Sequence, residues 1–140
     1  MFEFPYMQLP GGILRPMIAV VVEGPRGRRL LDGLLDTGSD RTIFPHREAQ
    51  VLGVALPAKA DGVLKTAGGV VIAYRIADVV LELRVSGNVV RWKTPAAFAE
   101  EPLSILHLGT RGFLEFFHTT FRGPESQVVL TPQSSLPVVA

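Results

Sequence analysis

The chain has 140 residues, of which 47% are hydrophobic and 19% are charged, so a disordered chain is excluded and one compact domain over residues 1–140 is expected. Its 14 basic residues nearly balance its 13 acidic ones, so no overall field points to nucleic acid or to an anionic membrane as a partner. Because the chain has no cysteine, disulfides and thiolate metal sites are also excluded.

The N-terminal segment lacks the pattern of a secretory signal. Residues 1–6 include Glu3 and Pro5, where a signal would have a basic start followed by an unbroken apolar run. No stretch approaches the roughly 20 apolar residues of a membrane span. We therefore expect a cytoplasmic protein.

The first half of the chain predicts a β-hairpin followed by a short helix. Residues 18–22 form an apolar, β-branched run, residues 24–27 break it, and residues 30–35 resume an extended segment that ends at Asp36. A helix over residues 46–52 fits the proline before it and the glycine after it.

The second half predicts two more hairpins and a second short helix. Residues 70–85 and 89–98 are extended segments joined by a Ser-Gly-Asn turn, and Glu82 and Arg84 lie on the face opposite the apolar side chains of the first segment. Residues 112–117 read as a phenylalanine-rich helix, and residues 118–122 and 127–131 as a closing hairpin. Strand signals about every 8 to 12 residues predict an all-β barrel or sandwich.

The sequence Asp36-Thr37-Gly38-Ser39 follows Leu34-Leu35 and occurs once. Hydrolysis of a peptide without a metal or a covalent intermediate needs two facing carboxyls, one to deprotonate a water and one to polarise the carbonyl and protonate the leaving nitrogen. Asp36 supplies one carboxyl, and Gly38 lets the backbone approach the other carboxyl and donate an N–H to it. The hydroxyls of Thr37 and Ser39 can lock the loop. The alternative is ordinary turn chemistry, which favours the same residue types.

Three landmarks occur in order between about residue 17 and residue 131. The first is the segment 34–44, with the Asp-Thr-Gly-Ser sequence and Thr42. The second is a glycine-bearing hairpin tip, Thr66-Ala67-Gly68-Gly69. The third is Leu108-Gly109 before an aromatic helix. The ordered set resembles that of single-domain retropepsin-like aspartic proteases of retroviruses and bacteria, in which the second landmark is a mobile flap. The resemblance implies a closed β-barrel with one or two short helices and a flap hairpin.

The resemblance also implies a role for each matching residue. Asp36 would be the catalytic aspartate, Thr37 would grip the partner's loop, and a Ser39 hydroxyl donating to the carboxylate should favour a lower working pH. The residues expected to bind substrate are Asp40, Ala67, Gly68, Gly69, His107 and Leu108. The residues expected to support the site are Thr42, Gly109 and Arg111.

Two positions depart from the family pattern. Asp40 should pair with an arginine directly after the late glycine, but Thr110 stands there and Arg111 comes one residue later. His107 replaces a residue that is usually aliphatic. It would either make a subsite polar and pH-sensitive or hydrogen-bond at a strand end.

A single aspartate motif implies a symmetric homodimer in which two Asp36 residues meet on the axis. The apolar segments 2–7 and 136–140 could interleave at that interface. We expect no cofactor and no metal, since His46, His107 and His118 lack metal-ligand spacing. Two functions remain open: a dimeric aspartic endopeptidase acting on peptides or proteins, and a dimerisation or peptide-binding module with little or no catalysis.

Overall fold

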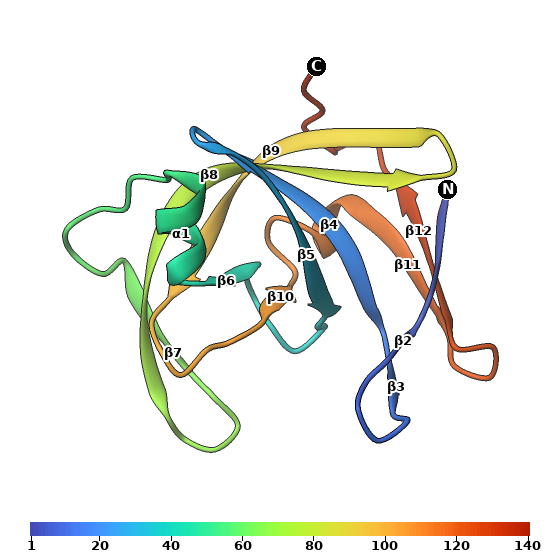
Figure 1. Ribbon diagram of the computed structural model, residues 1–140, viewed down its shortest axis with the longest axis horizontal. Helices are drawn as coiled ribbons and strands as arrows, with labels where there is room; N and C mark the ends of the chain where they lie inside the picture. Colours follow the sequence, from blue (N-terminus) through green and yellow to red (C-terminus); the bar gives the residue numbers. More distant parts are fainter.

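The computed structural model describes residues 1–140 and consists mostly of β-strands (Figure 1). It has twelve strands, one α-helix and one 3₁₀ turn. In chain order the elements are β1 (Phe2–Pro5), β2 (Met7–Gln8), β3 (Leu14–Arg15), β4 (Met17–Gly24), β5 (Gly27–Leu35), β6 (Ile43–Pro45), α1 (Arg47–Leu52), β7 (Gly62–Lys65), β8 (Val71–Val85), β9 (Asn88–Ala99), β10 (Leu106–Leu108), the 3₁₀ turn η1 (Leu114–Phe116), β11 (Phe117–Arg122) and β12 (Gln127–Pro132).

The main sheet closes into a barrel. Its strand order is β4-β5-β10-β6-β9-β8-β7, and a further pairing of β4 with β8 joins the sheet to itself and leaves β7 outside the ring. The predicted hairpins β4–β5 and β8–β9 are confirmed as antiparallel pairs. The closed all-β barrel that the sequence predicted is therefore the fold of this chain.

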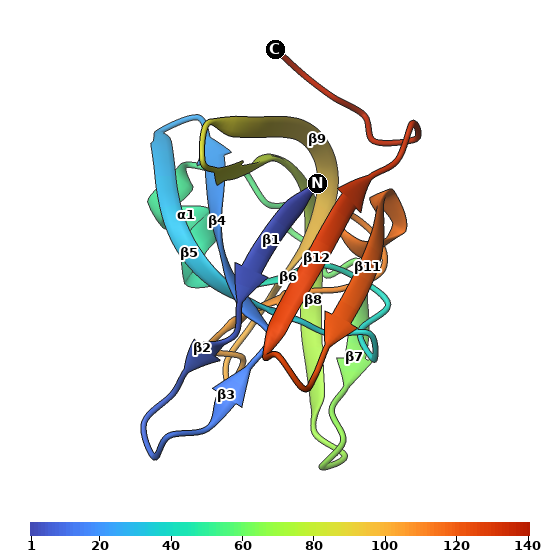
Figure 2. The same ribbon diagram turned by 90° about the vertical axis from the view of Figure 1, so that its right-hand side faces the viewer.

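A separate three-stranded sheet, ordered β1-β12-β11, contains the predicted closing hairpin (Figure 2). Phe2 pairs with Leu130, so the N-terminal segment adds a strand to its own chain. Near the other end, Val139 N donates to the carbonyl of Arg91 on β9 at 2.9 Å. Both terminal segments thus make backbone bonds within one chain, and their place in an interface stays a prediction.

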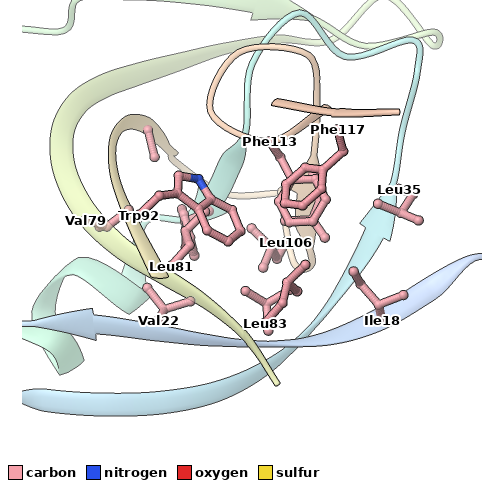
Figure 3. Close-up of a cluster of buried hydrophobic side chains, with 14 of the residues drawn as sticks. Ile18, Val22, Leu35, Val79, Leu81, Leu83, Trp92, Leu106, Phe113 and Phe117 are labelled. Carbon is pink, nitrogen blue, oxygen red and sulfur yellow. The ribbon is translucent and has the colours of Figure 1, made fainter. Parts of the chain in front are cut away.

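The hydrophobic core forms where every second side chain of a strand points inward. Figure 3 shows the rings of Trp92, Phe113 and Phe117 packed together inside the barrel. Trp92 is fully buried, contacts both phenylalanine rings edge to face, and donates its indole N–H to the Gly112 carbonyl at 2.9 Å. Since the buried indole N–H has a partner, this bulky residue fills the core without an unsatisfied donor.

One predicted helix is confirmed and the other is wrong. Helix α1 ends at Leu52 and is followed by Gly53, whose φ of 72° is the left-handed conformation that glycine adopts readily at helix ends. The segment 112–117 contains only the single 3₁₀ turn η1. Phe113 before the turn and Phe117 after it have non-helical backbones, and their rings stack in the core at 5.2 Å. The free energy gained by burying both rings outweighs the helical preference of this short segment.

Glu82, on the face of β8 opposite the apolar side chains, is nevertheless only 3% exposed. Three arginines cover it. Arg28 lies 2.8 Å and Arg84 3.3 Å from Oε2, and Arg91 lies 3.6 Å from Oε1. The negative charge of the Glu82 carboxylate is therefore balanced by positive charges from three strands, β5, β8 and β9.

Replacing Glu82 with Gln is expected to lower the free energy of unfolding by about 2 kcal/mol, because the arginines lose a charged acceptor. Urea denaturation followed by circular dichroism measures this change. Glu125→Gln is the matched control, because Glu125 is exposed in the β11–β12 turn and makes no ion pair. Equal stability of the two variants would contradict a stabilising role for the arginine cluster.

Candidate active site

The Asp36 loop begins where two neighbouring strands end. β5 and β10 run parallel, with Leu35 opposite Leu108, and the backbone N–H of Asp36 donates to the Leu108 carbonyl at 3.0 Å. The loop turns at once, since Ser39 N donates to the Asp36 carbonyl at 3.1 Å. The barrel thus fixes the backbone of Asp36 and leaves its side chain, which is 31% exposed, at the surface.

Both carboxylate oxygens of Asp36 have a partner within the chain. The Gly38 N–H donates to Oδ1 at 2.9 Å, and Nδ1 of His107 lies 3.0 Å from Oδ2. A Cβ at position 38 would lie only 3.3 Å from Oδ1, so glycine permits the close approach. Sequence reasoning expected this N–H to reach the second carboxyl, whereas the structure directs it to the carboxylate of its own loop.

The Ser39 hydroxyl does not contact the Asp36 carboxylate. It donates instead to the carbonyl of Arg41 at 2.7 Å and so closes the loop on itself. The second partner of the carboxylate is His107, a contact that sequence reasoning missed. The available signal was the Leu-His-Leu sequence of β10, in which both leucines are buried and the histidine takes the other face.

Gly109 and its neighbours hold the loop from the other side. Thr110 N donates to the Ser39 carbonyl at 2.9 Å, and Arg111 N donates to the Asp40 carbonyl at 3.0 Å. A Cβ at position 109 would lie 2.2 Å from the Arg41 carbonyl oxygen, so the crossing requires glycine. The two segments therefore pack backbone against backbone.

The arginine that should pair with Asp40 has no substitute. Arg111 reaches Asp40 only through its backbone N–H, and its side chain makes no ion pair with that carboxylate. Thr42, the other expected support, is fully buried and its backbone N–H donates to the Arg111 carbonyl at 2.9 Å. Asp40 itself is exposed and lines the cleft.

A cleft of about 660 Å³ lies between the Asp36 loop and the hairpin β7–β8. Figure 1 shows this hairpin extending beyond the barrel. Its predicted tip is confirmed: Thr66 N donates to the Val70 carbonyl at 2.9 Å, and Gly69 has a φ of 83°. The fifteen residues that line the cleft are Asp36, Gly38, Ser39, Asp40, Arg41, Ile43, Val63, Leu64, Lys65, Thr66, Ala67, Tyr74, Ala97, Leu103 and His107.

The expected substrate-binding residues divide into three groups. Asp40, Ala67 and His107 line the cleft. Gly68 and Gly69 are exposed at the hairpin tip beside it. Leu108 is fully buried in the core, because strand alternation turns it away from the face that carries His107.

One end of the cleft is basic. The guanidinium of Arg41 lies 5.6 Å from the centre of the Tyr74 ring. This cation–π contact joins the segment that follows the Asp36 loop to β8. A second cavity of about 430 Å³ shares Asp40 and these two residues with the cleft and adds Thr110 and Arg111 to its lining. Two arginines against one aspartate give this end a local positive charge.

The remaining polar side chains form no further centre. No group of three His, Asp or Glu side chains is arranged to hold a metal ion. None of the helices has the length and apolar character that a membrane crossing needs.

Comparison with known proteins finds a family model and solved structures that match the chain. A family model described as aspartyl protease matches residues 18–114. A retropepsin-like aspartic protease from Rickettsia conorii superposes with a TM-score of 0.57 at 21% identity, over 91% of this chain and 98% of that one. EIAV protease complexed with the inhibitor HBY-793 gives a TM-score of 0.46 at 19% identity, over 68% of this chain and 81% of that one.

No curated protein matches the chain. The family match, however, spans most of its length, from β4 through the Asp36 loop to the start of η1. The chain therefore belongs to the aspartyl protease family, whose members are aspartic-type endopeptidases, and its fold is retropepsin-like.

Proposed function

We propose that two copies of this single-domain chain pair about a two-fold axis and hydrolyse peptide bonds between their Asp36 carboxyls. The observation that supports this proposal is the single Asp36 loop, which presents one partly exposed carboxylate at the wall of a cleft. Thr37 and Gly38 beside it are exposed in the single chain. A second loop related by symmetry would supply the missing carboxyl and cover these residues.

In such a dimer the two carboxyls share one proton, because like charges in contact cannot both ionise without cost. The ionised Asp36 takes a proton from a water, and the water oxygen attacks the peptide carbonyl. The protonated Asp36 polarises that carbonyl and then gives a proton to the leaving nitrogen. Neither step needs a metal or a covalent intermediate.

We propose that the substrate is an extended peptide lying between Asp36 and the hairpin tip at residues 66–69. The cleft brings together the Asp36 loop, Ala67 of the tip and Asp40. Gly68 and Gly69 carry no side chain to obstruct the approach of a peptide backbone. In this position the exposed Asp40 can accept hydrogen bonds from substrate N–H groups.

A subunit-mixing experiment tests the dimer. After incubation with a ninefold excess of Asp36→Asn chain, wild-type protein is expected to keep about one tenth of its peptidase activity, because random pairing leaves few dimers with two aspartates. In the control, the same excess of variant is added immediately before the assay, so that the subunits have no time to exchange. Any loss of activity in the control comes from variant dimers that bind the substrate, and not from mixed dimers. Full activity after complete exchange would contradict the shared site.

The altered arginine region, where Arg111 bonds Asp40 only through its backbone, favours one second candidate, a module that dimerises and binds peptides with little or no catalysis. The measurement that separates the two functions is cleavage of a peptide library between about pH 4 and 7, at concentrations where sedimentation shows a dimer. Dimers without cleavage would support the second candidate. A protein that stays monomeric at high concentration would contradict both.

A further inference from the structure

His107 lies directly against the carboxylate proposed to carry out catalysis. Its Nδ1 is 3.0 Å from Oδ2 of Asp36, which is within hydrogen-bonding distance. The two side chains are partly shielded, with 22% of the histidine and 31% of the aspartate exposed. The same imidazole lines the cleft. It is therefore close to both the reacting group and the space for the substrate.

The position of His107 is fixed by its own chain. It pairs with Leu34 of β5 on one side and with Ile43 of β6 on the other, so β10 is held between two strands. The leucines at positions 106 and 108 are buried in the core. Alternation along the strand then leaves the histidine only the face that carries the Asp36 loop. This arrangement does not depend on a partner subunit.

An ionised carboxylate only accepts hydrogen bonds, so in this contact the imidazole donates its Nδ1–H to Oδ2. The Gly38 N–H donates to Oδ1 at 2.9 Å. The two donors come from different elements, one from the loop and one from β10. Together they fix the plane of the carboxylate, while its remaining lone pairs stay available to a water and to a second carboxyl.

We propose that His107 is a positioning residue that orients the Asp36 carboxylate. The inference rests on the proposed peptidase function. A carboxylate held by two donors does not need to be oriented when the substrate arrives, and a reacting group in the correct orientation lowers the barrier of the chemical step. The effect should therefore appear in kcat more than in KM.

Two substitutions separate this role from simple packing. His107→Leu keeps bulk but removes the donor, and it is expected to lower kcat about 10-fold with little change in KM. In His107→Asn the side-chain amide can donate from nearly the position of Nδ1, and it is expected to recover most of that loss. His118→Leu is the matched control, because His118 is exposed on β11 and does not line the cleft.

The contact between His107 and Asp36 can also be measured independently of peptidase activity. Long-range proton–nitrogen correlation spectra assign the proton on each imidazole nitrogen, and the signal lost in His107→Asn identifies this residue. We expect a proton on Nδ1 in the wild-type protein and its shift toward Nε2 in Asp36→Ala. The signals of His46 and His118 should not change, since both residues are exposed and make no contact with Asp36.

Each outcome decides a different question. Identical His107 spectra in wild-type protein and Asp36→Ala would overturn the contact, whatever the activity. A normal kcat in His107→Leu, or equal losses in the Leu and Asn variants, would overturn the positioning role while leaving the peptidase intact. Loss of the Nδ1 proton in Asp36→Ala together with no peptide cleavage by wild-type dimers would instead defeat the proposed function and, with it, the positioning role of His107 in catalysis.

Discussion

Asp36→Asn is expected to reduce kcat/KM for peptide cleavage by about 10³-fold, the range that loss of a general acid–base group produces. An amide neither takes a proton from water nor shares one with a facing carboxyl. The substitution affects both protomers of a dimer, so no intact half-site remains. Cleavage of a peptide library between about pH 4 and 7, followed by mass spectrometry, measures the loss.

The variant should keep its fold, because the amide oxygen can still accept the N–H of Gly38 and the side chain keeps its size. Circular dichroism and thermal unfolding check this point. Asp78→Asn is the matched control, since Asp78 is an exposed carboxylate on β8 outside the cleft lining. Equal cleavage by the Asp36→Asn variant and the wild-type protein would mean that another group, or a contaminating peptidase, does the chemistry.

Gly109→Ala is expected to destabilise the protein by about 3 kcal/mol or more, beyond the usual cost of one extra methyl group in a packed site. The new Cβ would lie 2.2 Å from the Arg41 carbonyl oxygen and 2.6 Å from that of Ser39. Both are backbone atoms of the Asp36 loop, so no side chain can rotate away. Relief would require breaking the bond from Thr110 N to the Ser39 carbonyl.

Urea denaturation measures this stability change, and the same samples can be assayed for cleavage. Gly123→Ala serves as the control, because a Cβ there meets no atom within 4 Å. We expect the control to change stability by less than about 0.5 kcal/mol. A Gly109→Ala protein as stable as the control would contradict the close crossing of the two segments.

Elements with a strong local signal were predictable from sequence. The hairpins were found because turn residues interrupt alternating apolar runs, and helix α1 because a proline and a glycine bound it. The segment 112–117 was misread because its phenylalanines have helical spacing, while in the structure the rings of Phe113 and Phe117 both pack into one core. Short segments follow such tertiary packing more than their own pattern.

The burial of the Glu82 carboxylate also could not be predicted from the sequence. Strand alternation correctly placed Glu82 on the face opposite the apolar side chains, but it could not show that arginines from other strands cover that face. The same reason explains Leu108, whose neighbour His107 takes the cleft side. Alternation gives the two faces of a strand, and only the assembled barrel shows what each face meets.

The sequence by itself determined the family resemblance, the barrel class and the presence of one Asp36 motif, because these depend on residue type and short-range order. Only the tertiary structure decided which groups hold the carboxylate. Strands β5 and β10 bring Asp36 and His107 together across 71 positions of the chain. Such a contact depends on how distant strands pair and in which register, and a one-residue shift would turn His107 into the core and leave Asp36 with a single donor.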